Sequence, residues 1–151
     1  MISARGEPPF LAEDRIRPEC AAPPMTGRAW LKIALAIVLA SYWISMFVGT
    51  HLPRMPQAFE GQSDKVLHLV GYGGLAVCLL ANLLLSRQPT LRNVALLWLL
   101  IGGYGVFDEV TQPFVGRHCD IEDWFADMTG GAAGLLLLWL CSRLLMNRSR
   151  S

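Results

Sequence analysis

Apolar residues along the chain are concentrated in four long runs separated by short polar segments. Each run has about the 20 residues that an α-helix needs to cross the hydrocarbon core of a bilayer. The runs cover residues 29–49, 66–85, 92–112 and 121–146. Lys32, a charged residue within the first run, lies near its end, where the side chain can reach the headgroups. The pattern predicts an all-α integral membrane protein built as a four-helix bundle.

Residues at the edges of the runs are typical of helix ends. Ser63 precedes the second run and offers an N-cap, and Pro113 ends the third. Asp120 precedes the fourth run, with Asp123 three residues later, as in a variant of the capping box. These signals support helices rather than strands in all four runs.

The distribution of basic residues predicts the orientation in the membrane. Four crossings place both chain ends and the segment between the second and third runs on one side. Of the 13 Lys and Arg residues, all but Arg54, Lys65 and Arg117 lie on that side. Because cytoplasmic segments are enriched in Lys and Arg, we expect both termini to be cytoplasmic.

The two ends of the chain are predicted to be tails. Residues 1–28 are polar, carry mixed charge and are rich in proline, a composition typical of disorder. They lack the apolar core of a signal peptide. We therefore expect a disordered cytoplasmic tail at 1–28, a membrane domain at 29–146 and a short cytoplasmic tail at 147–151.

Charge and cysteine content exclude several function classes. The 13 basic residues nearly balance 12 acidic ones and form no basic block, so no nucleic-acid partner is expected. The four cysteines are widely spaced and include no C-x-x-C pair, so neither a zinc knuckle nor a disulfide framework is predicted. The sequence contains no P-loop, dinucleotide fingerprint or Ser-His-Asp order, and no cofactor is predicted.

The predicted topology brings the remaining polar residues to the non-cytoplasmic face. They come from the start of the second run, the end of the third and the start of the fourth. We call this set the polar cluster: Asp64, Lys65, His68, Asp108, Glu109, Gln112, Arg117, Asp120, Asp123 and Asp127. A spacing of four residues puts Asp64 and His68 on one helix face, and Asp108 and Gln112 on another.

The fourth run carries a stripe of acidic and small residues that predicts which way the acids point. Asp123, Asp127, Gly130 and Gly134 share one helix face, so the carboxylates should point into the bundle. The two glycines form a G-x-x-x-G pair, which lets helix backbones approach closely in lipid. We expect this pair to pack within the chain. Formation of a homodimer through it is the alternative.

Three acids of the cluster are not explained by helix capping. Asp108 and Glu109 lie at a helix C-terminus, where negative charge opposes the helix dipole. Asp127 lies roughly 10 Å inside its helix. An ionisable group at such depth costs about 2.5–3.5 kcal/mol or more, so these acids need partners. A functional site is the favoured interpretation, and a purely structural ion-pair network remains the alternative.

A metal site is not predicted from the spacing. Three histidines and several carboxylates supply the right ligand types for a divalent ion. However, neither H-x-x-x-H nor H-x-x-E-H occurs in the sequence. The predicted site therefore has no assigned metal ligands.

Three segments resemble the VanZ-like family of membrane proteins. They are DKVLHLVGYGGL at 64–75, YGVFDEVTQPFVGR at 104–117 and DIEDWFADMTGGAAG at 120–134. The family pattern reads approximately D-K-x-x-H, D-E-x-x-Q and G-R-x-x-D-x-x-D-x-x-x-N-x-x-G. The family's usual Asn corresponds to Asp127, so this chain has an additional carboxylate at that position.

The resemblance implies a multi-pass protein of the bacterial cytoplasmic membrane with a role in the cell envelope. The founding member is associated with reduced susceptibility to teicoplanin-type glycopeptides. One hypothesis is an enzyme acting on a lipid-linked or phosphorylated envelope molecule. Lys65 and Arg117 would bind the anionic group, and His68 and Glu109 would supply acid–base chemistry. The alternative is a protein that only binds such a ligand, or whose polar cluster only ties the helices together.

The remaining residues of the cluster receive roles under the enzyme hypothesis as well. Asp108 and Asp127 are further catalytic candidates. The other candidates for ligand binding are Asp64, Gln112, Asp120 and Asp123. The bilayer is the one partner that the composition itself requires.

Overall fold

Four helices make up the part of the chain that the structure, a computed structural model, describes: residues 26–53 and 61–148. They are α1 (Gly27–Thr50), α2 (Asp64–Leu84), α3 (Leu91–Thr111) and α4 (Ile121–Arg148), with a 3-10 helix, η2 (Gln112–Val115), directly after α3. The described residues contain no strand. The predicted all-α class is confirmed, and the helix bounds differ from the predicted runs by a few residues. Most of the predicted N-terminal tail, like Arg54, lies outside the described residues.

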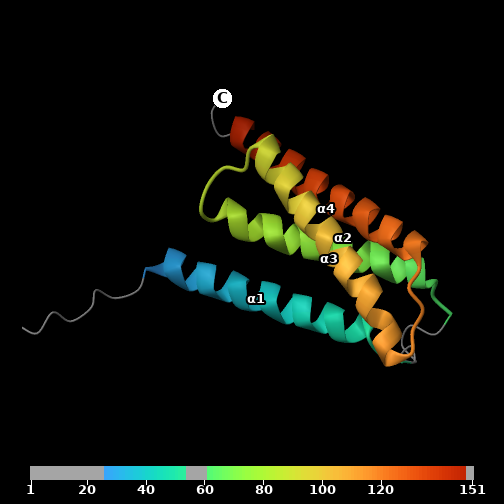
Figure 1. Ribbon diagram of the computed structural model, residues 1–151. Helices are drawn as coiled ribbons and strands as arrows, with labels where there is room; N and C mark the ends of the chain where they lie inside the picture. The colour runs from blue at the N-terminus through green and yellow to red at the C-terminus, as the bar shows by residue number, and fades with distance from the viewer. Residues whose placement is uncertain (1–25, 54–60, 149–151) are drawn as a thin grey trace, which may run out of the picture.

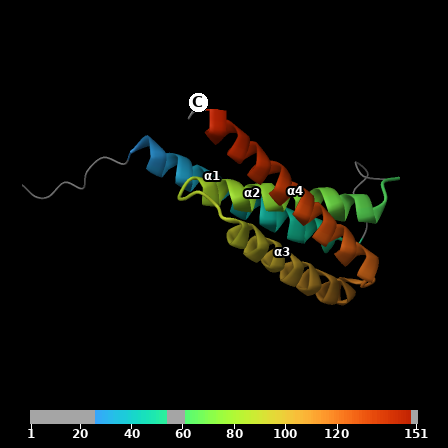
Figure 2. The ribbon, with the colours of Figure 1, turned by 90° about the horizontal axis from the view of Figure 1, so that it is seen from above.

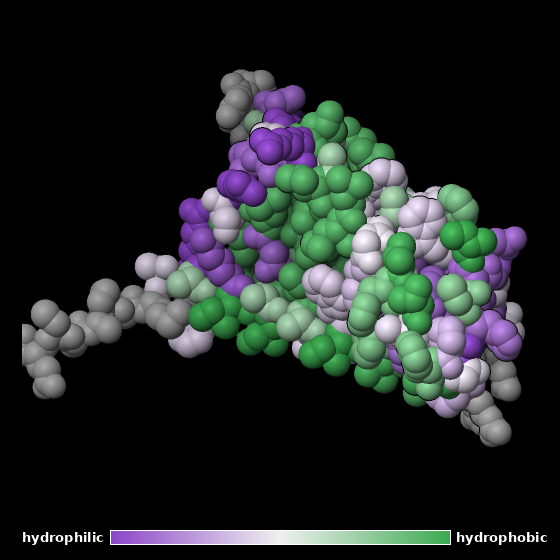
Figure 3. All heavy atoms as spheres, viewed as in Figure 1, coloured by the Kyte–Doolittle hydropathy of each residue, from purple (hydrophilic) through white to green (hydrophobic). Residues whose placement is uncertain are grey.

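All four helices are long and apolar enough to cross a membrane, and α3 together with η2 forms one such span, Leu91–Val115. Many large apolar side chains on these helices are exposed. In Figure 3 hydrophobic residues cover the middle of the visible face, and hydrophilic residues gather toward its two ends. So large an exposed apolar surface suits contact with lipid. The chain is a multi-pass membrane protein.

The helix ends agree only in part with the predicted capping. Asp120 accepts a hydrogen bond from the backbone N–H of Glu122 at 2.9 Å, as an N-cap does. Ser63 occupies the N-cap position of α2, but its side chain makes no capping bond. Pro113 ends α3 as an α-helix, yet the chain continues as η2 to Gly116, whose φ of 81° lies in the left-handed region.

Helices α2 and α4 cross in direct backbone contact. A Cβ atom added to Gly130 would collide with the carbonyl oxygen of Leu69, and one added to Gly134 would collide with that of Gly73. The G-x-x-x-G pair therefore packs within the chain, as expected. Beside this contact lies the apolar core, which includes Tyr72, Leu80, Val94, Ile101 and Leu135.

Helix α1 lies at the edge of the bundle. None of its residues, from Gly27 to Thr50, is buried. Its contacts along α2 include two hydrogen bonds, from the Tyr42 hydroxyl to the Gly71 carbonyl at 2.9 Å and from Asn82 to the Leu35 carbonyl at 3.1 Å. Figures 1 and 2 show α1 running beside α2, on a different side from α4.

The up-and-down arrangement gathers four helix ends at one end of the bundle, which we call the polar end. The C-terminal ends of α1 and α3 and the N-terminal ends of α2 and α4 meet there (Figure 1). The α2–α3 connection and the C-terminal end of α4 lie at the opposite end (Figure 1). The topology thus brings together the segments that carry the polar cluster.

Candidate functional site

The buried polar side chains of the described residues all belong to the polar cluster. They are His68, Asp108, Glu109, Gln112, Asp123 and Asp127. Asp123 and Asp127 point into the bundle, as the stripe on the fourth run predicts. The other four members of the cluster, Asp64, Lys65, Arg117 and Asp120, lie at its rim and are partly or largely exposed. The structure therefore divides the predicted site into a buried half and a rim.

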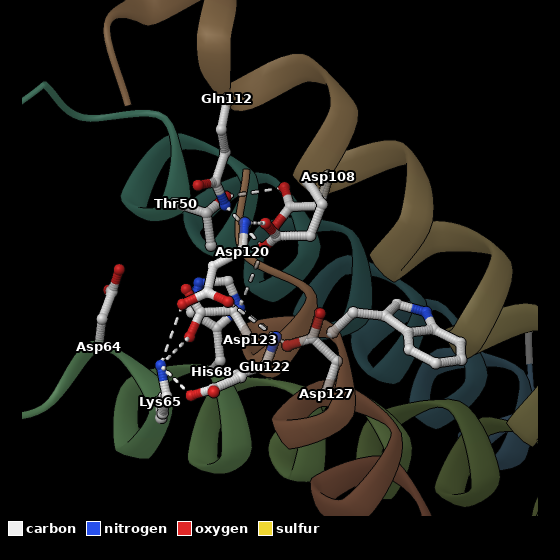
Figure 4. Close-up of polar contacts among 12 residues, drawn as sticks. Thr50, Asp64, Lys65, His68, Asp108, Gln112, Asp120, Glu122, Asp123 and Asp127 are labelled. Carbon is white, nitrogen blue, oxygen red and sulfur yellow. Dashed lines mark hydrogen bonds and ion pairs between the residues drawn. The ribbon is translucent and has the colours of Figure 1, made fainter. Parts of the chain in front are cut away.

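His68 is the centre of the buried half. Its Nδ1 atom lies 2.8 Å from Asp127 Oδ1 and 3.9 Å from Glu109 Oε1 (Figure 4). These contacts join α2 to α4 and approach α3. With Asp127 ionised, its carboxylate only accepts hydrogen bonds, so Nδ1 is the donor and the orientation of the imidazole ring is fixed. An Asn at position 127, as in the family pattern, could accept the same bond through its amide oxygen without adding charge.

Glu109 connects α3 to the start of α4. Its Oε2 atom accepts a hydrogen bond from the backbone N–H of Asp120 at 2.8 Å, and its Oε1 atom accepts one from Gln112 at 3.2 Å. In a capping box, the N–H of Asp120 would be bound by the side chain three residues later, Asp123. That prediction is wrong in this respect, because Glu109 takes this role from another helix. Asp123 turns inward instead and is 4% exposed.

Lys65 and Arg117, the two cations expected to bind an anion, already contact carboxylates. Lys65 Nζ lies 3.0 Å from Asp120 Oδ2, 3.1 Å from Glu122 Oε2 and 3.7 Å from Asp123 Oδ1 (Figure 4). Arg117 pairs with Asp64. The backbone N–H of Glu122 and the Lys65 ammonium both stabilise the charged form of Asp120, so its pKa is lowered. An incoming anion would have to replace these carboxylates.

Two threonines that sequence reasoning missed hold Asp108 and its surroundings. Thr50, the last residue of α1, donates to Asp108 Oδ1 at 2.8 Å. The next residue, His51, lies 2.8 Å from the hydroxyl of Thr111 through Nε2 and 3.6 Å from Asp108 through Nδ1. A hydroxyl beside a histidine where an apolar run ends was a signal available in the sequence. These contacts tie α1 to α3 at the polar end.

Several buried polar atoms of the cluster have no hydrogen-bond partner among the described residues. They are His68 Nε2, Asp108 Oδ2, Gln112 Oε1, Asp123 Oδ1 and Asp127 Oδ2. Most buried polar atoms in folded proteins are paired, so such a concentration at one place needs an explanation. It shows that the cluster has more hydrogen-bonding capacity than the described residues use.

Two cavities reach the cluster from different directions. The first, which we call the α1–α2 groove, has a volume of about 330 Å³ and is lined mainly by apolar parts of α1 and α2, including Met46, Leu67 and Val70. Asp64, His68 and Arg117 also line it. The second, the polar pocket, has a volume of about 450 Å³, and its lining includes Lys65, His118, Asp120 and Asp123. Asp64 and Arg117 border both cavities.

The fold and the site define a multi-pass membrane protein with a buried acid–histidine network at one end of a helix bundle. The family described as VanZ/LLP1 matches residues 21–142, and the chain belongs to this family. This confirms the resemblance inferred from the three segments. No curated protein and no solved structure matches the chain.

Proposed function

We propose that the protein binds an amphipathic anionic envelope lipid, with the hydrocarbon chain in the α1–α2 groove and the headgroup at the polar end. The observation that carries this proposal is the composition of the groove. Its walls are apolar between two membrane-spanning helices, yet its lining also includes Asp64, His68 and Arg117. A volume of about 330 Å³ is within the range of small-molecule sites, roughly 300–1,000 Å³.

The headgroup chemistry follows from the rim. A guanidinium binds phosphate through two parallel hydrogen bonds, and Arg117 borders both the groove and the polar pocket. A phosphate placed there would compete with Asp64 for Arg117 and would lie near Lys65. Lipid-linked and phosphorylated envelope molecules share this chemistry, so the shared feature is an anionic phosphate next to an apolar chain.

Chemical modification of the bound headgroup is the further part of the proposal. Glu109 is less suited to acid–base chemistry than its position suggests, since both of its oxygens accept hydrogen bonds from the protein. His68 lines the groove and is oriented by Asp127, so it is the better placed of the two acid–base candidates. Asp108 and Gln112 would support this network from α3.

The proposed setting is the bacterial cytoplasmic membrane with both termini inside, which puts the polar end outside. Cys119 is exposed and lies just before α4 at that end. On intact cells, an impermeant maleimide should label the wild-type protein and fail to label Cys119→Ser. Labelling of Cys119 that requires permeabilised cells would reverse the orientation.

A groove-filling variant tests lipid binding. A Cβ atom on Gly71 would lie 3.5 Å from Met46 Sδ, so Gly71→Leu places its side chain in the groove. Gly103→Leu is the matched control, because a Cβ atom there meets nothing within 4 Å. Native mass spectrometry of protein purified with its lipids should show an anionic lipid on the wild type and on Gly103→Leu, with a several-fold loss in Gly71→Leu. Equal lipid content in all three proteins would refute groove binding.

The structural alternative predicts different behaviour. If the cluster only ties helices together, no anionic lipid should copurify, and changing Arg117 and Asp64 together to Gln and Asn should leave the lipid content unchanged. Under the proposed function, that double variant removes the preference for anionic lipid while leaving the groove intact. Replacing Arg117 and Asp64 together leaves no unpaired charge, so a change in lipid content cannot come from such a charge.

A further inference from the structure

His68 is presented in the way that metal-binding histidines are. Its Nδ1 atom is fixed by the Asp127 carboxylate at 2.8 Å, which leaves Nε2 as the free ring nitrogen. Nε2 is buried without a hydrogen-bond partner among the described residues, on a side chain that is 2% exposed. A histidine that ligates a metal almost always donates its other N–H to a carboxylate, carbonyl or water, which fixes the ring. Asp127 meets this requirement.

Two further carboxylates, those of Asp64 and Asp123, lie close to His68. Asp64, His68 and Asp123 each offer a ligand atom, and these three atoms lie within 4.8 Å of one another. In Figure 4 the His68 ring lies between Asp127 on one side and Asp64 with Lys65 on the other. Donors around one ion at bond lengths of about 2.0–2.2 Å are roughly 3–3.5 Å apart. Small side-chain rotations would therefore bring the three into coordination.

Asp123 provides a second unsatisfied group. Its Oδ1 atom is buried and accepts no hydrogen bond from the described residues, with Lys65 Nζ 3.7 Å away. Because Glu109 binds the Asp120 N–H, Asp123 is not needed for capping and turns inward. The residue is thus available as a ligand within 4.8 Å of a ring nitrogen of His68.

The polar pocket gives an ion access to the two carboxylates and room for further ligands, whereas His68 lines the α1–α2 groove, with which the pocket shares Asp64. Asp64 and Asp123 both line this pocket of about 450 Å³. Lys65 and Arg117 are the competing cations. Lys65 is 45% exposed and has closer partners in Asp120 and Glu122, so it can stay at the rim when Asp123 turns to an ion. Arg117 pairs with Asp64, so the Asp64 carboxylate would have to contact both the guanidinium and the ion.

A second triad, His68, Glu109 and Asp127, also lies within ligand distance but is less suited. It is fully buried, and both Glu109 oxygens already hold protein groups. Asp127 Oδ1 is bound to His68 Nδ1. An ion at this place would break two contacts between helices, from Glu109 to the Asp120 N–H and from His68 to Asp127, and the local bond from Gln112 to Glu109.

We propose that His68 Nε2, Asp123 and Asp64 bind a divalent transition-metal ion, with Asp127 as the residue that orients His68. One nitrogen and two carboxylate ligands suit Zn²⁺ or Mn²⁺ better than Ca²⁺ or Mg²⁺, which prefer oxygen alone. The ion's open positions would face the polar pocket, where an anionic oxygen could bind. The ion site goes beyond lipid binding, and while an ion is bound it takes the place of the acid–base role proposed above for His68. It is tested with the metal alone, so lipid binding and ion binding can each fail without the other.

The test uses the purified full chain, freed of metal with a chelator and titrated with Mn²⁺ under electron paramagnetic resonance. We expect one tightly bound Mn²⁺ per chain, with nitrogen hyperfine coupling from a single imidazole. Asp123→Asn should weaken binding about tenfold or more, whereas Asp120→Asn, a neighbouring rim carboxylate outside the ligand set, should change it no more than about threefold. Asp127→Asn keeps an acceptor for His68 Nδ1, so it should weaken binding less than Asp123→Asn and by less than the roughly 10–100-fold typical of losing a residue that orients a ligand.

The same experiment can overturn the proposal. Equal weakening in Asp123→Asn and Asp120→Asn would indicate diffuse attraction of a cation to acidic residues. The absence of nitrogen coupling in the wild-type protein would exclude His68 as a ligand. This measurement uses no variant, so it does not depend on whether a variant folds. A wild-type stoichiometry near zero would also refute it.

Discussion

The two contacts that α2 makes with α4 and α1 differ in how closely the backbones approach. Against α4, glycines bring backbone to backbone, so that even a methyl group at Gly130 or Gly134 would collide with a carbonyl of α2. Against α1, longer side chains such as Tyr42 span the gap and leave a groove of about 330 Å³. The first contact fixes the bundle, and the second leaves space for a ligand.

The largest effect should come from breaking the α2–α4 contact. In Gly130→Leu the new side chain would meet the backbone of Leu69, which cannot move without shifting the whole helix. We expect a loss of about 3 kcal/mol or more in the free energy of unfolding, and little monodisperse protein after purification. Gly103→Leu adds the same side chain where a Cβ meets nothing within 4 Å, and should behave as wild type. Normal yield of Gly130→Leu would show that the close contact is not required.

The next effect concerns the buried hydrogen-bond network around His68, which lies at the polar end beside both the α2–α4 and the α1–α2 contact. His68→Ala removes the partner of Asp127 and leaves a fully buried carboxylate with no hydrogen bond from residue 68. Leaving a buried hydrogen-bond acceptor without its donor costs about 1–3 kcal/mol, measurable by denaturant unfolding in detergent. Asp127→Asn keeps the acceptor for His68 Nδ1 and matches the family pattern, so its stability should stay near that of the wild type. If both variants lose the same stability, the hydrogen bond is not what matters.

A smaller effect should follow from loosening the α1–α2 contact. Tyr42→Phe removes the hydrogen bond to the Gly71 carbonyl but keeps the aromatic ring in the groove wall. We expect about 0.5–1.5 kcal/mol of destabilisation in thermal unfolding, with the rest of the bundle unaffected. A loss as large as that of Gly130→Leu would mean that α1 is as tightly bound as α4, contrary to the comparison.

The smallest effect is a pH dependence at the rim. The pKa of Asp120 is lowered by the Glu122 N–H and by Lys65, so the folded protein favours its charged form. Its contribution to stability is present above the unfolded pKa of about 3.9 and is lost as the pH falls through the lower folded value. Unfolding curves recorded on the acid side should therefore differ less between pH values in Asp120→Asn than in the wild type. A larger pH dependence of unfolding in Asp120→Asn than in the wild type would contradict the lowered pKa of Asp120.

The helices and the location of the site could be predicted from the sequence because both depend on information along one chain segment. The length of each apolar run fixes a span, and the stripe from Asp123 to Gly134 fixes which face turns inward. The partners across helices could not be predicted in the same way. That Glu109 binds the Asp120 N–H, or that Thr50 reaches Asp108, depends on how closely α1, α3 and α4 approach one another. The groove was missed for the same reason.

The dispersal of the buried network over three helices constrains how the protein is made. His68, on α2, and Glu109, on α3, emerge from the ribosome before Asp127 and the Asp120 N–H, their partners at α4. Until the fourth helix arrives, His68 lacks Asp127 and Glu109 lacks the Asp120 N–H, so that Gln112 is the only one of its hydrogen-bond donors described above that Glu109 has. Helices α2 and α3 therefore need α4 before their buried polar groups are fully paired. A nascent chain interrupted before position 120 should be degraded by membrane quality control.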